Sequence, residues 1–267
     1  MATRIISKNG QVEQESQYSA EELKVRQHNK QKELPTVYLP DYSCMTHNCN
    51  KCNNKRKIAY LNDDGEFALK QCDCVAEIRI KSMLRKSGML DIADRYTLEN
   101  YTTGETWQEH IKNVAKEFIA DAGQNWFFIG GQVGCGKSHI CTAIVIELIK
   151  QGKQADYMKW HDESMELKQN ITDSEKYDKR VKELKTAPVL YIDDFFKSAP
   201  TVADKRLAFE IIDHRYNNRN LITIVSSELQ IRDIIAQDEA TGSRIYERSK
   251  KYQININPDI NKNYRLR

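Results

Sequence analysis

The sequence has no long apolar segment. None of its runs approaches the roughly 18 consecutive apolar residues that a membrane-spanning helix requires. Residues 1–17 also lack the apolar core of a secretory signal peptide. We therefore expect a cytoplasmic protein without membrane contact, whose seven cysteines stay reduced.

The sequence also lacks a large excess of either charge. Its 41 Lys and Arg residues against 38 Asp and Glu residues leave a formal net charge of +3, which permits contact with nucleic acid but does not predict it. No internal repeat or low-complexity tract is present. With 267 residues, the chain is long enough for one hydrophobic core and one small additional module.

Composition and apolar periodicity divide the chain into four parts. Residues 1–41 form a polar tail with one expected helix, which starts at a capping box around Ser19 and ends before Pro35. Residues 42–78 form a small module rich in cysteine, asparagine and lysine, and residues 79–105 form a helical linker. In residues 106–267, helical and strand patterns alternate along the chain.

This alternation predicts an α/β domain with a mainly parallel sheet. Two of the expected strands, 126–129 and 189–192, are continuous apolar runs, which are typical of strands buried on both faces. We expect helices over 107–121, 138–151 and 204–217, a charged helical stretch that reaches Lys185, and strands over 126–129, 155–160, 189–192, 221–225 and 252–256.

A phosphate-binding motif lies between the first expected strand of this domain and the helix that follows. Glycines let such a loop turn its N–H groups toward phosphate oxygens, and the helix start adds a partial positive charge. Lys137 is expected to reach the β- and γ-phosphates of ATP, and the Ser138 hydroxyl to bind Mg²⁺. The spacing G-x-x-x-x-G-K-S is met by Gly131, Gln132, Val133, Gly134, Cys135, Gly136, Lys137 and Ser138, and the predicted nucleotide site also includes His139.

Two acidic residues end the apolar run at 189–192. Asp193 follows this strand directly, 56 residues (193 − 137) after Lys137, so it is expected at the sheet edge that carries the phosphate loop. We predict that Asp193 binds Mg²⁺ directly or through water. Asp194 is placed to orient or deprotonate the attacking water, and the alternative is an ordinary helix N-terminal carboxylate.

Two close pairs of cysteines lie on either side of a turn signal at Asp63-Asp64-Gly65. Each pair can offer two thiolates to one tetrahedral ion, for which zinc is the usual occupant. Such an ion would hold together a segment that is too small to fold alone. The predicted ligands are Cys49, Cys52, Cys72 and Cys74; Cys44 and His47 are alternative ligands, and an iron–sulfur cluster is the alternative occupant.

Four segments together resemble the DnaC/DnaI group of AAA+ ATPases, which are bacterial and phage helicase loaders. They are NWFFIGGQVGCGKSHICTAI, VLYIDDFF, IDHRYNNRNLITIVSS and GSRIYERSKK, in the order seen in that group. The resemblance covers residues 106–257, and the cysteine module looks like the zinc-binding amino-terminal domain of the DnaI branch. It implies that 106–267 is an AAA+ ATPase domain, slow in hydrolysis and stimulated by its partners.

The resemblance also implies partners. A loader binds the replicative hexameric helicase through its amino-terminal part and helps place it on single-stranded DNA, while ATP controls assembly and release. AAA+ domains of this group associate side by side, so that an arginine of one subunit completes the ATP site of the next. Arg244 and Arg248 are the matching candidates, and Arg248 is the preferred one.

Two departures from the family pattern affect the predicted site. The polar sensor that follows strand 221–225 in the family is replaced by Ser226-Ser227-Glu228, so that Ser227 or Glu228 takes its place and the hydrolysis rate is open. Only 39 residues (267 − 228) follow that segment, from which we expect a reduced or absent helical lid.

Other interpretations remain open from the sequence. A transposition-type AAA+ regulatory ATPase would share the fold, and a non-hydrolysing adaptor would use ATP as a structural ligand. Contact with single-stranded DNA could involve aromatic and basic residues together, although the same residues could belong to the core. Two such sets are Arg215, Tyr216 and Arg219, and Tyr157, Lys159 and Trp160.

Overall fold

The computed structural model describes residues 49–61, 67–86, 95–121, 123, 125–169 and 174–266. The expected helix at 19–34, the turn at 63–65 and the alternative ligands Cys44 and His47 lie outside these ranges. The chain divides into two compact units, Met1–Ile78 and Arg79–Arg267. In the described ranges, no helix has the length and apolar character needed to cross a membrane.

The smaller unit is built on an antiparallel strand pair. Strand β1 (Lys57–Leu61) pairs with β2 (Phe67–Gln71) in a register that sets Lys57 opposite Gln71. Helix α2 (Cys74–Lys86) begins in this unit. The buried residues of the unit that cluster together are four cysteines with Val75 and Ile78. Cysteines therefore make up most of the small buried cluster of this unit.

The larger unit contains a five-stranded sheet in the order β4-β5-β6-β3-β7, in which every neighbouring pair is parallel. The predicted mainly parallel sheet is therefore confirmed. The expected strands all form, with ends that differ from the predicted ones by one or two residues. They are β3 (Phe127–Gly131), β4 (Ala155–Lys159), β5 (Val189–Asp193), β6 (Ile222–Ser227) and β7 (Gln253–Ile256).

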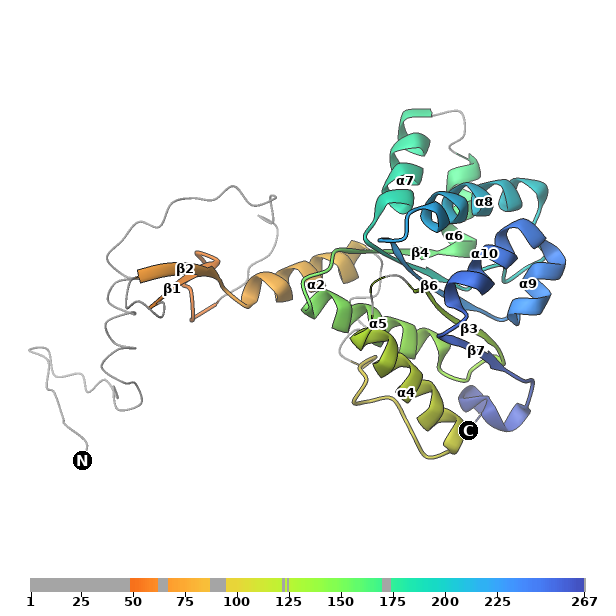
Figure 1. Ribbon diagram of the computed structural model, residues 1–267, viewed down its shortest axis with the longest axis horizontal. Helices are drawn as coiled ribbons and strands as arrows, with labels where there is room; N and C mark the ends of the chain where they lie inside the picture. Colours follow the sequence, from red (N-terminus) through yellow and green to blue (C-terminus); the bar gives the residue numbers. More distant parts are fainter. Residues whose placement is uncertain are drawn as a thin grey trace, which may run out of the picture. The chain divides into compact units, whose positions relative to one another are not determined.

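Helices cover both faces of this sheet (Figure 1). One face packs against α4 (Thr106–Ala120) and α5 (Lys137–Lys150), and side chains alternate between the two faces along each strand. Phe127 and Ile129 therefore join the core beneath these two helices, whereas Phe128 joins the opposite core. Such two-sided burial explains why the inner strands β3 and β5 are buried along their whole length and read as apolar runs.

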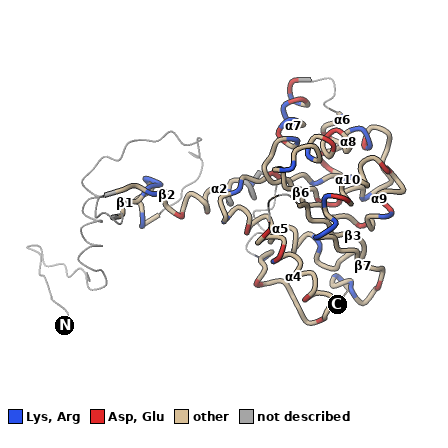
Figure 2. The backbone as a smooth tube through the Cα atoms, in the orientation of Figure 1, with Lys and Arg blue, Asp and Glu red and all other residues tan. Residues whose placement is uncertain are grey.

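The opposite face is covered by helices of more mixed composition. The charged stretch forms two helices, α6 (Trp160–Gln169) and α7 (Ser174–Thr186), where the sequence predicted one continuous helical stretch. The chain continues through α8 (Val202–Asn217), α9 (Ile231–Gln237) and α10 (Glu239–Ser249). Lys and Arg alternate with Asp and Glu along α7 and α8 (Figure 2).

The parallel arrangement gathers the carboxyl ends of the central strands at one edge of the sheet. In the pairing of β3 with β6, Gly130 lies opposite Ser227, and in the pairing of β4 with β5, Lys159 lies opposite Asp193. The loop between β3 and α5 leaves the sheet at this edge. Predicted site residues at the ends of three strands, β3, β5 and β6, are thereby brought together.

Candidate functional site

The loop between β3 and α5 has the backbone conformation of a phosphate cradle. Gly131, Gly134 and Gly136 have φ angles of 108°, 72° and 90°, a region that residues with a Cβ rarely adopt. Gly136 is also the residue that caps the start of α5. The amino end of a 14-residue helix therefore opens onto the loop, with the unpaired N–H groups and partial positive charge that bind anions.

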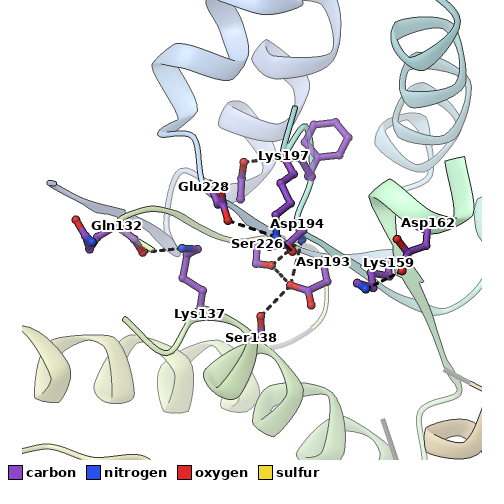
Figure 3. A network of polar contacts seen from close by, with 12 residues as sticks. Gln132, Lys137, Ser138, Lys159, Asp162, Asp193, Asp194, Lys197, Ser226 and Glu228 are labelled. Carbon is purple, nitrogen blue, oxygen red and sulfur yellow. Dashed lines mark hydrogen bonds and ion pairs between the residues drawn. The ribbon is translucent and has the colours of Figure 1, made fainter. Parts of the chain in front are cut away.

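Lys137 lies inside the curve of this loop. Its Nζ donates to the carbonyl oxygens of Gly131 at 2.9 Å and Gln132 at 2.7 Å, and the residue is buried (Figure 3). A buried ammonium group enclosed by backbone dipoles is a second feature that favours a bound anion. Loop, helix start and Lys137 together fit a polyphosphate.

The other side chains of the loop bond to the protein. Gln132 accepts a hydrogen bond from the Asp259 N–H at 2.7 Å, and the Cys135 thiol donates to the Gln132 carbonyl at 2.9 Å. Burial raises the pKa of the Cys135 thiol. Val133 is half-buried. These three residues therefore present backbone groups to a ligand rather than reactive side chains.

His139 points to a different segment. Its Nε2 lies 2.9 Å from the Thr97 carbonyl oxygen, its ring stacks on Tyr96 at 4.8 Å, and Tyr101 packs edge-on at 5.2 Å between ring centroids. Burial lowers the pKa of this histidine. His139, which the sequence assigned to the nucleotide site, thus lies in the first turn of α5 and packs against residues 96–101.

Ser138 and Asp193 meet at the mouth of the loop. The Ser138 hydroxyl donates to Asp193 Oδ1 at 3.1 Å, so the two predicted Mg²⁺ ligands are in direct contact (Figure 3). Asp193 also accepts from Tyr191, from Tyr157 and, through a short bond, from Ser226. A carboxylate beside a hydroxyl oxygen is a donor set that Mg²⁺ accepts, so these residues fit the ion.

Asp194 belongs to a separate charged group. Its carboxylate lies 2.7 Å from Lys197 Nζ, and the same ammonium lies 3.5 Å from Glu228 Oε1 (Figure 3). The hydrogen bond to Asp194 is the main cause that raises the pKa of Lys197. Asp194 has a φ of 54°, a left-handed conformation that turns the chain at the strand end. Glu228 is therefore beside the predicted water-orienting residue.

Ser227, the predicted sensor, is turned away from this group. It is fully buried, donates to the Phe195 carbonyl at 2.6 Å and accepts from the Leu229 N–H at 3.0 Å. The neighbouring Ser226 contacts Asp193 instead. The alternation of β6 carried this signal, since Ile222, Ile224 and Ser226 share the face that packs on α5. In this geometry Ser226, rather than Ser227, is the serine that contacts the predicted Mg²⁺ ligand, and Glu228 follows at the end of the strand.

The two candidate arginines on α10 differ in exposure. Arg248 is buried; it donates to the carbonyl oxygens of Tyr216 at 2.9 Å and Arg219 at 3.2 Å, and lies 5.1 Å from the Trp126 ring centroid. Arg244 retains a side-chain exposure of 27%. The exposed Arg244 side chain is therefore the more accessible of the two to a neighbouring subunit, and the choice of arginine finger stays a prediction.

Arg244 is held at the surface by several groups. Its Nε donates to Asp213 at 2.9 Å, and its guanidinium lies 4.9 Å from the Phe209 ring and 5.4 Å from the Tyr216 ring. Its Nη1 also donates to the Ala240 carbonyl oxygen at 2.7 Å, and contact with two aromatic rings further restricts this long side chain. The position thus fits an arginine presented to a partner.

The two sets of aromatic and basic residues considered for DNA contact divide by burial: Arg215 and Trp160 are buried, whereas Arg219 and Lys159 are exposed. Arg215 is fully buried and donates to Thr223 and to the carbonyl oxygens of Ala187 and Ile222, and burial lowers its pKa to about 9. Trp160 is buried among Phe195 and Phe196. The interpretation as core residues therefore holds for Arg215 and Trp160.

The four predicted zinc ligands form one cluster in the smaller unit. All four sulfur atoms lie within 4.8 Å of one another, with Cys49 and Cys72 at 3.8 Å and Cys52 and Cys74 at 3.6 Å. With Zn–S bonds of about 2.3 Å, a tetrahedral ion sets its sulfur ligands about 3.8 Å apart. The cluster is therefore compatible with a zinc ion.

Comparison with known proteins agrees with this geometry. The family model of IstB-like ATP-binding proteins matches residues 55–267. Two proteins of Bacillus subtilis (strain 168) are each 30% identical: XkdC of the phage-like element PBSX, over 79% of this chain and 82% of XkdC, and YqaM, over 74% of this chain and 66% of YqaM. The replicative helicase loader DnaC of Escherichia coli (strain K12) is 23% identical over 61% of this chain and 68% of DnaC.

Solved structures share the fold of the larger unit. A crystal structure of DnaI superposes with a TM-score of 0.53 at 20% identity, over 62% of this chain and 93% of DnaI. A crystal structure of the DnaC helicase loader superposes with a TM-score of 0.52 at 23% identity, over 62% of this chain and 99% of DnaC. The family model covers most of the chain, including the phosphate loop and both acidic residues. The chain therefore belongs to the family of IstB-like ATP-binding proteins.

Proposed function

We propose that this protein is an ATP-dependent loader, which binds the replicative hexameric helicase and helps place it on single-stranded DNA. The observation that carries the proposal is the contact of Ser138 with Asp193 at the mouth of the phosphate loop, because it joins the two halves of an ATP–Mg²⁺ site. The relatedness to DnaC, at 23% identity, supports the role of loader. ATP would then control assembly with the helicase and release from it.

The residues of the site would divide the work of ATP hydrolysis. Loop N–H groups and Lys137 hold the β- and γ-phosphates, and Ser138 and Asp193 hold Mg²⁺, which neutralises charge on the phosphate oxygens. Asp194 orients or deprotonates the attacking water. Its ammonium partner Lys197 must first share or release that carboxylate, which agrees with slow, partner-stimulated hydrolysis.

ATP binding is tested with Lys137→Ala in the full chain. We expect the substitution to abolish ATP binding in calorimetry, because the loop loses the charge that faces the phosphates. Lys150→Ala is the matched control, since Lys150 lies at the exposed end of the same helix and pairs with Glu147. Affinity within a few-fold of the unchanged protein would contradict the phosphate site.

Helicase binding is tested by capture of the replicative hexameric helicase on the full chain. We expect capture of the helicase with ATP, and loss of capture when the cysteine cluster is removed by Cys72→Ser and Cys74→Ser together. The Lys137→Ala variant should still bind the helicase, but its release from the helicase should change. Capture that survives loss of the cysteines would move helicase contact to residues 106–267.

A transposition ATPase is the second candidate, supported by the 26% identity, over 53% of this chain, to a protein of insertion sequence IS232 of Bacillus thuringiensis subsp. berliner. Transposase captured in place of helicase would select this function. A non-hydrolysing adaptor is the third candidate. It would bind ATP yet show no turnover with helicase and single-stranded DNA both present.

A further inference from the structure

The carboxylate of Asp193 is enclosed by hydroxyl groups from three strands and one helix. Tyr191 donates to Oδ1 at 2.7 Å, Ser138 donates to Oδ1 at 3.1 Å, and Ser226 makes a short bond to the same oxygen. Tyr157 donates to Oδ2 at 3.2 Å. The backbone N–H of Asp194 adds a further donor to Oδ1 at 3.1 Å.

All of these donors are neutral. In the part of the chain that the structure describes, each hydrogen bond to the Asp193 carboxylate comes from a hydroxyl or a backbone N–H. Asp194 differs, because its carboxylate pairs with the ammonium of Lys197. Neutral donors fix a carboxylate without cancelling its charge, so Asp193 keeps a full negative charge for a cation.

The two tyrosines hold different oxygens of this carboxylate. Tyr191 is fully buried on β5 and its hydroxyl also contacts Ser226 at 3.3 Å, so Oδ1 is restrained from within the sheet. Tyr157 comes from β4, the edge strand, and approaches Oδ2. Together they restrict rotation of the carboxylate about its last bond, which is how outer groups orient a metal ligand.

The edge position of Tyr157 is itself anchored. Arg180 on α7 donates to the Tyr157 carbonyl oxygen at 3.3 Å and to both oxygens of the adjacent Asp156, at 2.6 and 3.2 Å. The Tyr157 ring also packs at 5.2 Å from the Tyr191 ring. These contacts restrain the edge strand β4 at Tyr157, the residue whose hydroxyl contacts Asp193.

We propose that Tyr157 and Tyr191 are positioning residues that orient the Asp193 carboxylate for Mg²⁺ in the nucleotide site. This inference rests on the proposed ATP–Mg²⁺ function and assigns two residues that the phosphate motif does not contain. Removal of either hydroxyl leaves the charge of Asp193 and the residues that face the phosphates unchanged. The expected consequence of removing either hydroxyl is a lower affinity for Mg²⁺ with an unchanged affinity for ATP.

The test uses Tyr157→Phe and Tyr191→Phe in the full chain. ATP affinity is measured by calorimetry without Mg²⁺ and across a Mg²⁺ titration. We expect the half-saturating Mg²⁺ concentration to rise about tenfold in each variant, as is typical when a group that orients a metal ligand is lost, while metal-free ATP affinity stays within twofold.

Tyr252→Phe is the matched control. Tyr252 is as buried as Tyr191, and its hydroxyl donates to a carboxylate, Asp121, at 2.6 Å, beside the strand at the opposite edge of the sheet. The Tyr252→Phe variant should lose comparable stability while its half-saturating Mg²⁺ concentration stays that of the parent protein. Unchanged Mg²⁺ dependence in both site variants, with a clear dependence in the parent protein, overturns this inference alone. Absence of Mg²⁺-dependent ATP binding in the parent overturns the proposed function as well.

Discussion

Gly134 has two reasons to be glycine. Its φ is 72°, and a Cβ built there would lie 1.9 Å from Asn263 Oδ1, in a segment whose Tyr264 N–H donates to the Gly134 carbonyl at 3.0 Å. We expect Gly134→Ala to lower the free energy of unfolding by about 1–3 kcal/mol and to weaken ATP binding. Urea denaturation and calorimetry measure the two effects.

Gly104→Ala is the control for this change, because a Cβ at Gly104 meets no atom within 4 Å. Its unfolding free energy should stay near that of the parent protein. Equal behaviour of the two alanine variants would contradict the role assigned to the loop conformation.

His139 predicts a pH dependence of stability. Burial lowers its pKa in the folded protein, so below the unfolded-state pKa of about 6.5 the unfolded chain binds a proton more readily than the folded one. Stability from this residue is therefore present at neutral pH and declines as the pH falls below about 6.5. Urea denaturation at pH 7.5 and 5.5 should show a smaller decline in His139→Gln, and an equal decline would contradict the assignment.

At the scale of the element, α10 is attached to the rest of the larger unit by Arg248. Its guanidinium donates to the Tyr216 carbonyl oxygen in the last turn of α8 and to the Arg219 carbonyl oxygen just after it, and lies over the Trp126 ring. We expect Arg248→Ala to reduce the free energy of unfolding by about 2–4 kcal/mol, because charged hydrogen bonds and packing are lost together. Arg244→Ala should cost less than about 1 kcal/mol, as for a surface ion pair. Urea denaturation of both variants provides the comparison, and the reverse order would contradict the exposure argument.

We expect the stability of the β1–β2 pair to depend on the four clustered cysteines of the smaller unit. We expect metal analysis to find about one zinc ion per chain. Chelation should then increase hydrogen exchange of the amides in 57–71 while strand β5 stays protected, since the larger unit has its own core. Cys141→Ala is the control variant, because Cys141 lies in that separate core. A chain with this substitution should retain the metal. Purified protein that is free of metal yet protected in 57–71 would reject the zinc site.

At the scale of the whole molecule, the exposed Arg244 predicts that neighbouring subunits share an ATP site. Lys137→Ala and Arg244→Ala chains should each be inactive in ATP hydrolysis. Their mixture should regain activity, because an intact nucleotide site of one variant can meet an intact Arg244 of the other. A mixture of Arg244→Ala with the double variant provides the control, since neither chain offers the arginine. Equal activity of the two mixtures would contradict a shared site.

Much of the fold and part of the site could be predicted from the sequence because the signals are local. Continuous apolar runs predicted the parallel strands, and the glycine spacing predicted a loop between β3 and α5. A parallel sheet collects its strand ends at one edge, so the meeting of Ser138 with Asp193 also followed from the order of elements. Family membership rests on these same segments.

Only the tertiary structure distinguished between residues that are equivalent in the sequence. Arg244 and Arg248 lie one helical turn apart, and neighbouring helices rather than α10 itself bury Arg248. Strand alternation predicts opposite faces for the adjacent Ser226 and Ser227, but only the packing of the sheet decides that Ser226 contacts Asp193 and Ser227 the Phe195 carbonyl. Tyr157 reaches Asp193 across 36 residues of chain because β4 pairs with β5. Local pattern determines which elements form, whereas burial and side-chain contacts arise from packing between elements that are distant in the chain.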